Sequence, residues 1–186
     1  MKKASVLLAL IMVAAIFIGC KNEKAKPVIE KSTTATATAN DGDSTIYGVM
    51  LDGGNHSLLL LTNEGDTLEF IENPDDTVEV VKGGKLAGDK FAVISYEEYG
   101  DRILRSAVNL TSLLGNWKSL DKDFEIKEGG EILSNIEAEQ NPWTNWRIYN
   151  GKLVLSKDTF DIIELSDSME LGNDNGNFVF GRSKAK

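Results

Sequence analysis

The chain has 186 residues, with 17 Gly, 3 Pro, a single Cys, a single His and a formal net charge of -9. One Cys cannot form an internal disulfide framework or a thiolate zinc site, and one His disfavours a His-based catalytic device or metal centre. The acidic balance argues against nucleic acid as a partner, because phosphates call for a basic face. We therefore expect one or two small domains with no catalytic residue, no metal and no cofactor.

The first twenty residues have the composition of an export signal. Lys2 and Lys3 precede an apolar run over residues 6–18, and Gly19 then precedes Cys20. A positive start, a short apolar region and a small residue before the cut are the parts of a secretory signal. The apolar run has 13 residues, which at ~1.5 Å per residue gives roughly 20 Å, less than a ~30 Å hydrocarbon core.

The sequence Phe17-Ile18-Gly19-Cys20 resembles the lipobox of bacterial lipoproteins. The resemblance implies that residues 1–19 are a signal peptide and that Cys20 becomes the new N-terminus, acylated on its sulfur with palmitate-type chains. Two acyl chains make a stable membrane anchor, which a single chain does not. An ordinary signal peptide with an incidental Cys, or an uncleaved anchor, are the alternatives.

Residues 20–43 are expected to form a disordered tether. They are polar, carry a Thr/Ala-rich run over 33–39, and have no apolar period. Surface-exported lipoproteins place acids directly after the lipidated Cys, whereas Lys21 to Lys24 here are not acidic as a group. We therefore expect a lipid-anchored protein of the cell envelope, at the outer membrane and facing the periplasm. Removing residues 1–19 changes the net charge to -11 because two Lys are lost.

Residues 44–110 are predicted to form a small β-barrel. Short β-rich runs are separated by Gly, Asn and Asp, with no long helical period. A closed barrel also leaves no exposed strand edge. The order of a Gly-containing first strand, a hairpin and a Gly-Asp turn before an apolar strand resembles an OB-type barrel. The expected strands cover residues 46–50, 57–62, 67–70, 77–81, 91–94 and 102–108.

Residues 111–186 are predicted to form a second barrel, an antiparallel meander of seven or eight strands. Thr111 is expected to cap a short helical turn that Gly115 ends. Asn150-Gly151 is a strong signal for a two-residue hairpin. The whole folded part is therefore predicted to be all-β, with an OB-like barrel followed by a second small barrel.

The second barrel resembles a lipocalin. Gly115-Asn116-Trp117 is similar to the Gly-x-Trp motif of that family, and Arg182 stands where a basic residue of the last strand stacks on the Trp. The stretch from Leu113 to Arg182 resembles the lipocalin-like domains of Bacteroidetes-type lipoproteins. The resemblance implies that Gly115, Trp117 and Arg182 close the barrel. At about 70 residues, the unit is near half the size of a full lipocalin.

Trp143 and Trp146 are the candidate ligand-binding residues. They either line the mouth of a ligand site or plug the barrel, since Trp buries a large apolar area in a small core. The oxygen-rich run 173–177 reads as a hairpin turn in preference to a calcium loop, because it lacks the Glu that completes an EF-hand. His56 has no identifiable nucleophile partner and is expected at the surface.

These features predict a non-catalytic, envelope-anchored lipoprotein. Its lipocalin-like domain is expected to bind a small apolar or amphipathic ligand, or a partner protein. The alternative is an envelope sensor or assembly factor that acts through protein–protein contacts. An OB-type barrel paired with a lipocalin-like barrel is similar to the copper-response outer-membrane lipoproteins of enteric bacteria, although here the order is reversed and Cys-x-x-Cys motifs are absent.

Overall fold

The computed structural model describes residues 42–183. The predicted signal peptide, Cys20 and most of the predicted tether lie outside the described residues. The described part is nearly all β, with fourteen strands and one four-residue helix, α1 (Leu110–Leu113). The strands form two sheets, and each sheet curves into a barrel. The predicted fold class, two small β-barrels, is confirmed.

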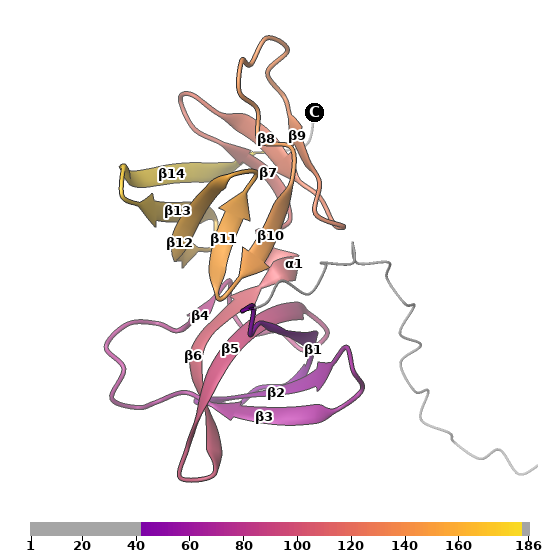
Figure 1. Ribbon diagram of the computed structural model, residues 1–186, viewed down its shortest axis with the longest axis vertical. Helices are drawn as coiled ribbons and strands as arrows, with labels where there is room; N and C mark the ends of the chain where they lie inside the picture. Colours follow the sequence, from indigo (N-terminus) through magenta and orange to yellow (C-terminus); the bar gives the residue numbers. More distant parts are fainter. Residues whose placement is uncertain (1–41, 184–186) are drawn as a thin grey trace, which may run out of the picture. The chain divides into compact units, whose positions relative to one another are not determined.

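The first barrel is closed and has five main strands (Figure 1). Neighbouring strands follow the order β3-β2-β1-β5-β6, and a parallel contact of Ile71 with Ile103 joins β3 to β6. This connectivity, with one parallel pair closing an otherwise antiparallel sheet, is that of the OB-type barrel predicted from the sequence. The strands are β1 (Ile46–Asp52), β2 (Ser57–Thr62), β3 (Thr67–Ile71), β5 (Lys90–Glu98) and β6 (Asp101–Asn109).

The core of the first barrel follows the alternation of its strands. In β2, Leu58, Leu60 and Thr62 point inward and are buried, while the residues between them are partly exposed. This period of two places one face of each strand against the core. Phe70 and Phe91 fill the interior with these leucines, and both are fully buried.

The strand predicted over residues 77–81 is mostly absent. Only β4 (Val81–Lys82) forms, and it pairs in parallel with Ala107 and Val108 of β6. Among the preceding residues, Val80 alone has a backbone hydrogen bond to β6, which it accepts from Ala107, and Val78 is largely exposed. Alternation alone was insufficient because a strand also needs a partner for its backbone groups.

The helical turn between the barrels starts earlier than predicted. Its cap is Asn109, whose side chain accepts a hydrogen bond from the Ser112 backbone, not Thr111. The Asn109 amide also donates to Gly83 and to the Asp89 carboxylate. Asn109 therefore joins the end of β6, the helix and the loop after β4, which explains why this buried position is polar.

The second barrel is an antiparallel meander of eight strands and is nearly closed (Figure 1). Strand β14 pairs with β7, which joins the last strand of the meander to the first. At the remaining seam, between β9 and β10, a bridge between Glu131 and Asn145 connects the two sides. The strands are β7 (Gly115–Lys118), β8 (Asp123–Ile126), β9 (Ile132–Ser134), β10 (Trp146–Tyr149), β11 (Lys152–Leu155), β12 (Asp158–Leu165), β13 (Ser168–Asn173) and β14 (Gly176–Ser183).

The interior of the second barrel is filled with side chains. The inward residues come from all eight strands, and their exposed fractions lie between 0 and 8%. A barrel of eight strands is just wide enough for side chains to fill it. The buried set comprises Trp117, Phe124, Ile126, Ile132, Ile148, Leu153, Leu155, Phe160, Ile162, Leu165, Met169, Leu171 and Phe180.

The two barrels share part of one core. Ala92 and Val108 of the first barrel belong to the buried cluster of the second, and Tyr47 packs against that cluster. The Tyr47 hydroxyl donates to the Ile148 carbonyl at 2.8 Å, and burial, followed by the charge of Asp43, raises its pKa to about 12. The described residues therefore form one packed unit, and the barrels are not separated by a linker.

Candidate functional site

The loop between β9 and β10, residues 135–145, covers one end of the second barrel. It carries Trp143, whose indole packs edge-on against three aromatic rings of the core. Its ring centroid lies 5.2 Å from Phe124, 5.8 Å from Phe160 and 6.2 Å from Phe180. Edge-to-face pairs at these distances are favourable beyond the area that they bury. Trp143 therefore acts as a plug for this end of the barrel.

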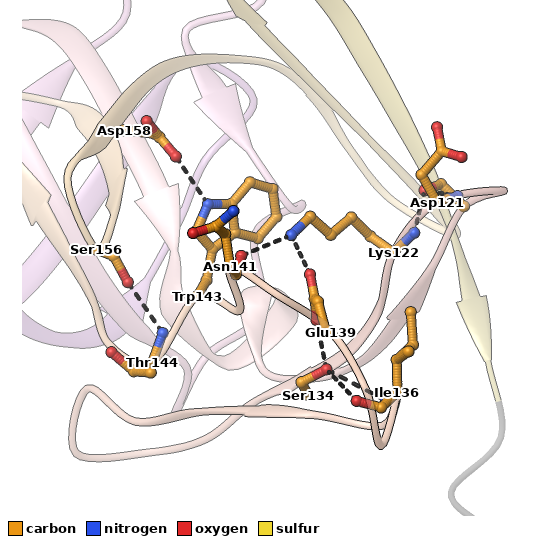
Figure 2. Close-up of polar contacts among 11 residues, drawn as sticks. Asp121, Lys122, Ser134, Ile136, Glu139, Asn141, Trp143, Thr144, Ser156 and Asp158 are labelled. Carbon is orange, nitrogen blue, oxygen red and sulfur yellow. Dashed lines mark hydrogen bonds and ion pairs between the residues drawn. The ribbon is translucent and has the colours of Figure 1, made fainter.

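Two polar groups hold the Trp143 indole in place (Figure 2). Its Nε1 donates to the Asp158 carboxylate at 3.0 Å, and the Lys122 ammonium lies 4.7 Å from the ring centroid. A cation over an indole face is attracted by the negative face of the ring. The indole is thus fixed by a hydrogen bond at its edge and by a charge over its face.

The Lys122 ammonium also ties the loop to the barrel. It pairs with the Glu139 carboxylate and donates to the Asn141 carbonyl, and Ser134 donates to the same carboxylate (Figure 2). Burial alone would raise the pKa of Glu139, but the hydrogen bonds from Lys122 and Ser134 outweigh it and lower the pKa. Glu139 is therefore held as an anion at neutral pH.

A surface hollow of about 370 Å³ lies beside Trp143. It is lined by the indole and by amide, hydroxyl, ammonium and carboxylate groups of two loops. The Thr144 backbone donates to Ser156 at 2.9 Å and joins those loops. We call this region the Trp143 face; its lining residues are Asn141, Pro142, Trp143, Thr144, Asn145, Ser156, Lys157 and Asp158.

Trp146 is placed differently from Trp143. It lies in β10 at the seam with β9, where its Nε1 donates to the Lys127 carbonyl at 2.7 Å. It is partly buried and packs against the core, but it does not line the hollow. The structure thus brings one of the two predicted ligand-site tryptophans to the Trp143 face.

Gly115, Trp117 and Arg182 meet where β7 pairs with β14. Trp117 is fully buried and donates to the Leu113 carbonyl, and the Arg182 guanidinium lies 4.3 Å from its ring centroid. Arg182 also donates to the carbonyls of Ser112 and Leu114. Gly115 has φ +121°, and a Cβ there would lie 3.1 Å from the guanidinium, so its lack of a side chain leaves room for Arg182.

His56 and residues 173–177 do not line the Trp143 face. Within residues 42–183, no three His, Cys, Asp or Glu side chains gather so as to hold a metal ion. His56 lies exposed in the loop before β2 and borders a smaller hollow of about 180 Å³ with Glu72 and Thr77. Residues 173–177 include the turn between β13 and β14, which is residues 174–175, and the Asn173 side chain accepts from the Asn175 backbone.

Sequence reasoning missed the polar residues that hold Trp143 in place. Lys122, Glu139 and Asp158 are far apart in the chain, and none belongs to a recognisable motif. They meet only because the 135–145 loop folds back over the barrel end. The sequence carried one indication of this loop, its composition. Asn141, Pro142 and Asn145 are residue types that favour turns, and they flank Trp143.

Comparison of the chain with protein-family models, with curated proteins and with solved structures found no match. In the part of the chain that the structure describes, no helix has the length and apolar character to cross a membrane.

Proposed function

We propose that this protein is a bacterial lipoprotein, anchored in the cell envelope through acyl chains on Cys20. The support is in the sequence: a positive start, a short apolar run and a single Cys at the end of a lipobox-like motif. Two acyl chains hold a protein stably at a membrane. Because Lys21 to Lys24 carry two Lys and only one acid, the proposed location is the outer membrane, facing the periplasm.

Metabolic labelling with palmitate tests the anchor. The wild-type chain should incorporate label, and Cys20→Ser should abolish incorporation because no other Cys is present. Persistence of label in Cys20→Ser would contradict the anchor. A signal-cleaved chain that never carries label would favour an ordinary secreted protein.

We infer further that the anchored part works by binding, without catalysis, and that its partner is a protein bound on the outer surface of the second barrel. The observation that carries this inference is the filled interior, whose lining side chains are at most 8% exposed. A calyx for an apolar ligand would need that space to be open. We therefore propose that binding occurs on the outer surface of this barrel, at the Trp143 face, where an aromatic ring lies beside solvent-exposed polar groups.

Site-directed photo-crosslinking in intact cells tests the protein-binding function. A photoreactive residue in place of Pro142, which is exposed and lines the hollow, should give one discrete protein adduct. The matched control replaces Asn63, which is exposed in the β2–β3 turn of the first barrel. Equal or absent adducts at the two positions would contradict binding at the Trp143 face.

A small amphipathic ligand is the second candidate, favoured by the hollow of about 370 Å³ beside the Trp143 indole. Its volume is in the range of small-molecule pockets. Titration with the fluorescent probe 1-anilinonaphthalene-8-sulfonate should then enhance probe fluorescence, and Trp143→Phe should weaken the response. A response that is unchanged in Trp143→Phe would exclude this face as the site.

A further inference from the structure

The β5–β6 hairpin extends beyond the body of the first barrel (Figure 1). Strand β5 pairs with β1 only over Lys90–Val93, whereas β5 and β6 continue to pair with each other up to Glu98 and Asp101. All six residues 97–102 at the end of the hairpin are exposed. We call this segment the Tyr99 tip.

The turn at the Tyr99 tip has an unexpected residue. Tyr99 and Gly100 both have positive φ, +52° and +94°, which is a turn that favours Asn-Gly. The chain uses Asn150-Gly151 in the equivalent turn between β10 and β11, with φ +47° and +78°. A left-handed conformation is disfavoured for a bulky residue by ~1–2 kcal/mol. Asn at position 99 would therefore give a more stable turn.

The Tyr99 ring does nothing for the fold to offset that strain. Its exposed fraction is 101%, and it makes no hydrogen bond, ring contact or cation–π contact with residues 42–183. Asn150, in contrast, uses its side chain to bond Ser44 and Gly42. One turn thus carries a residue with a structural role, and the other carries an aromatic ring held out in solvent.

The charges beside Tyr99 are also unfavourable for the hairpin. Glu98 lies directly opposite Asp101 in the register, and like charges in such a pair destabilise a sheet. Glu97 lies opposite Arg102, so the Tyr99 tip has three carboxylates and one guanidinium. The result is an aromatic ring at the centre of an anionic end.

We propose that the Tyr99 tip is an interaction surface that inserts Tyr99 into an apolar pocket, rimmed by Lys or Arg, on a protein partner. Tyr99 in a left-handed conformation and Glu98 opposite Asp101 are both unfavourable for the hairpin, and neither side chain stabilises the fold. Such features are expected where function overrides stability. Exposed Tyr is a common anchor of protein interfaces, and complementary charge steers and orients the encounter. The carboxylates disfavour an anionic membrane or a nucleic acid. This surface is on the first barrel and does not rest on the function proposed for the Trp143 face.

Two substitutions separate the role of the tip in binding from its role in folding. Tyr99→Asn and Glu98→Thr should leave the melting temperature of the chain unchanged or raise it, because each removes a local strain or repulsion. Both should weaken partner binding. A melting temperature several degrees lower in Tyr99→Asn would show that the ring serves the fold, and would overturn the proposal.

Photo-crosslinking in living cells tests the proposal directly. A benzoyl-phenylalanine in place of Tyr99 keeps an aromatic ring at the tip and should form one discrete protein adduct. Leu120 is the matched control, because it is also fully exposed (102%) and lies in the β7–β8 turn of the other barrel. The adduct at position 99 should fall about tenfold in a Glu98→Lys, Asp101→Lys background, because complementary charge is lost. Excess mature chain should compete for the adduct, and Tyr99→Asn chain should not.

The outcomes separate this surface from the Trp143 face. No discrete adduct at position 99, an equal adduct at position 120, an adduct to lipid, or an adduct insensitive to charge reversal would each refute the Tyr99 tip as a protein-binding surface. The Pro142 crosslink reports on the other face independently, so either surface can fail while the other stands.

Discussion

Two tryptophans pack in the core of the second barrel, and a cationic side chain lies over the ring of each. Arg182 lies 4.3 Å from the ring centroid of Trp117, and Lys122 lies 4.7 Å from that of Trp143. The two tryptophans differ in solvent exposure, because Trp117 is fully buried and Trp143 is partly exposed beside a hollow. Trp117 therefore stabilises the core, whereas we propose that Trp143 serves recognition as well as stability.

Arg182→Ala should destabilise the protein. The substitution removes the cation over Trp117 and two hydrogen bonds to the carbonyls of Ser112 and Leu114. We expect the free energy of unfolding to fall by about 2 kcal/mol in urea titrations. The matched control is Arg147→Ala, since the Arg147 guanidinium lies 5.3 Å from the Tyr149 ring centroid and has no such hydrogen bonds within residues 42–183. Equal losses in the two variants would contradict the closing role of Arg182.

Glu139 makes the 135–145 loop sensitive to acid. Because its pKa is lowered on folding, its stabilising contribution is fully present above the ordinary value of 4.5 and is lost as the pH falls through the lower, folded value. Acid should therefore loosen the loop and change Trp143 fluorescence. Glu139→Gln should lower stability at pH 7, and its difference from wild type should shrink below pH 4.5. Glu137→Gln, an exposed position in the same loop, is the control and should leave stability at pH 7 as in wild type. A Glu139→Gln difference that does not change with pH would contradict the assignment.

The β10–β11 hairpin is the element that fastens the second barrel to the start of the described chain. Its turn residue Asn150 accepts a hydrogen bond from the Ser44 backbone at 2.9 Å and donates to the Gly42 carbonyl at 2.8 Å. The same turn lies beside Ile148, which accepts from Tyr47. A two-residue hairpin turn thus also serves as a contact between segments about a hundred residues apart.

Asn150→Gly should preserve the turn but remove this contact. Gly keeps the positive φ but removes the side-chain hydrogen bonds, so the free energy of unfolding should fall by about 1–2 kcal/mol. Tyr99→Gly, in the equivalent turn of β5–β6, should cause no loss, because Tyr99 contacts nothing in the described chain. Urea unfolding of both variants provides the comparison. A loss of stability seen only in Tyr99→Gly would contradict the structural role of Asn150.

The elements that local sequence determines were the ones predicted correctly. Asn150-Gly151 forms the expected hairpin, and the short alternating runs with turn residues between them correctly indicated two β-barrels. The strand over 77–81 was wrong because alternation does not supply a neighbouring strand, and the helix cap was wrong because Asn109 competes with Thr111. The polar network around Trp143 was not predictable, since Lys122, Glu139 and Asp158 meet only through the fold of a long loop.

At the scale of the whole molecule, the two barrels behave as one folded unit. Ala92 and Val108 of the first barrel are buried in the core of the second, and Lys82 donates to the Ile163 carbonyl across the contact. We expect damage to one barrel to be felt in the other. The two proposed surfaces, the Trp143 face and the Tyr99 tip, then lie on one folded unit.

Leu58→Ala tests this coupling. Leu58 is fully buried in the first barrel, and its truncation should lower the free energy of unfolding by about 2–5 kcal/mol. All three tryptophans lie in the second barrel, so Trp fluorescence reports on that barrel alone. The urea midpoint seen by Trp fluorescence should therefore shift in Leu58→Ala, and Leu120→Ala should leave it in place. An unchanged midpoint in Leu58→Ala, with lost hydrogen-exchange protection in β1–β3, would show two independent domains.

Native mass spectrometry of the chain extracted from its own envelopes tests both the acyl anchor on Cys20 and the filled interior of the second barrel. We expect a polypeptide that begins at Cys20 and carries acyl chains, with no small apolar molecule retained inside the second barrel. A chain that begins elsewhere or lacks acyl mass, or one that retains a stoichiometric apolar ligand, would contradict this expectation.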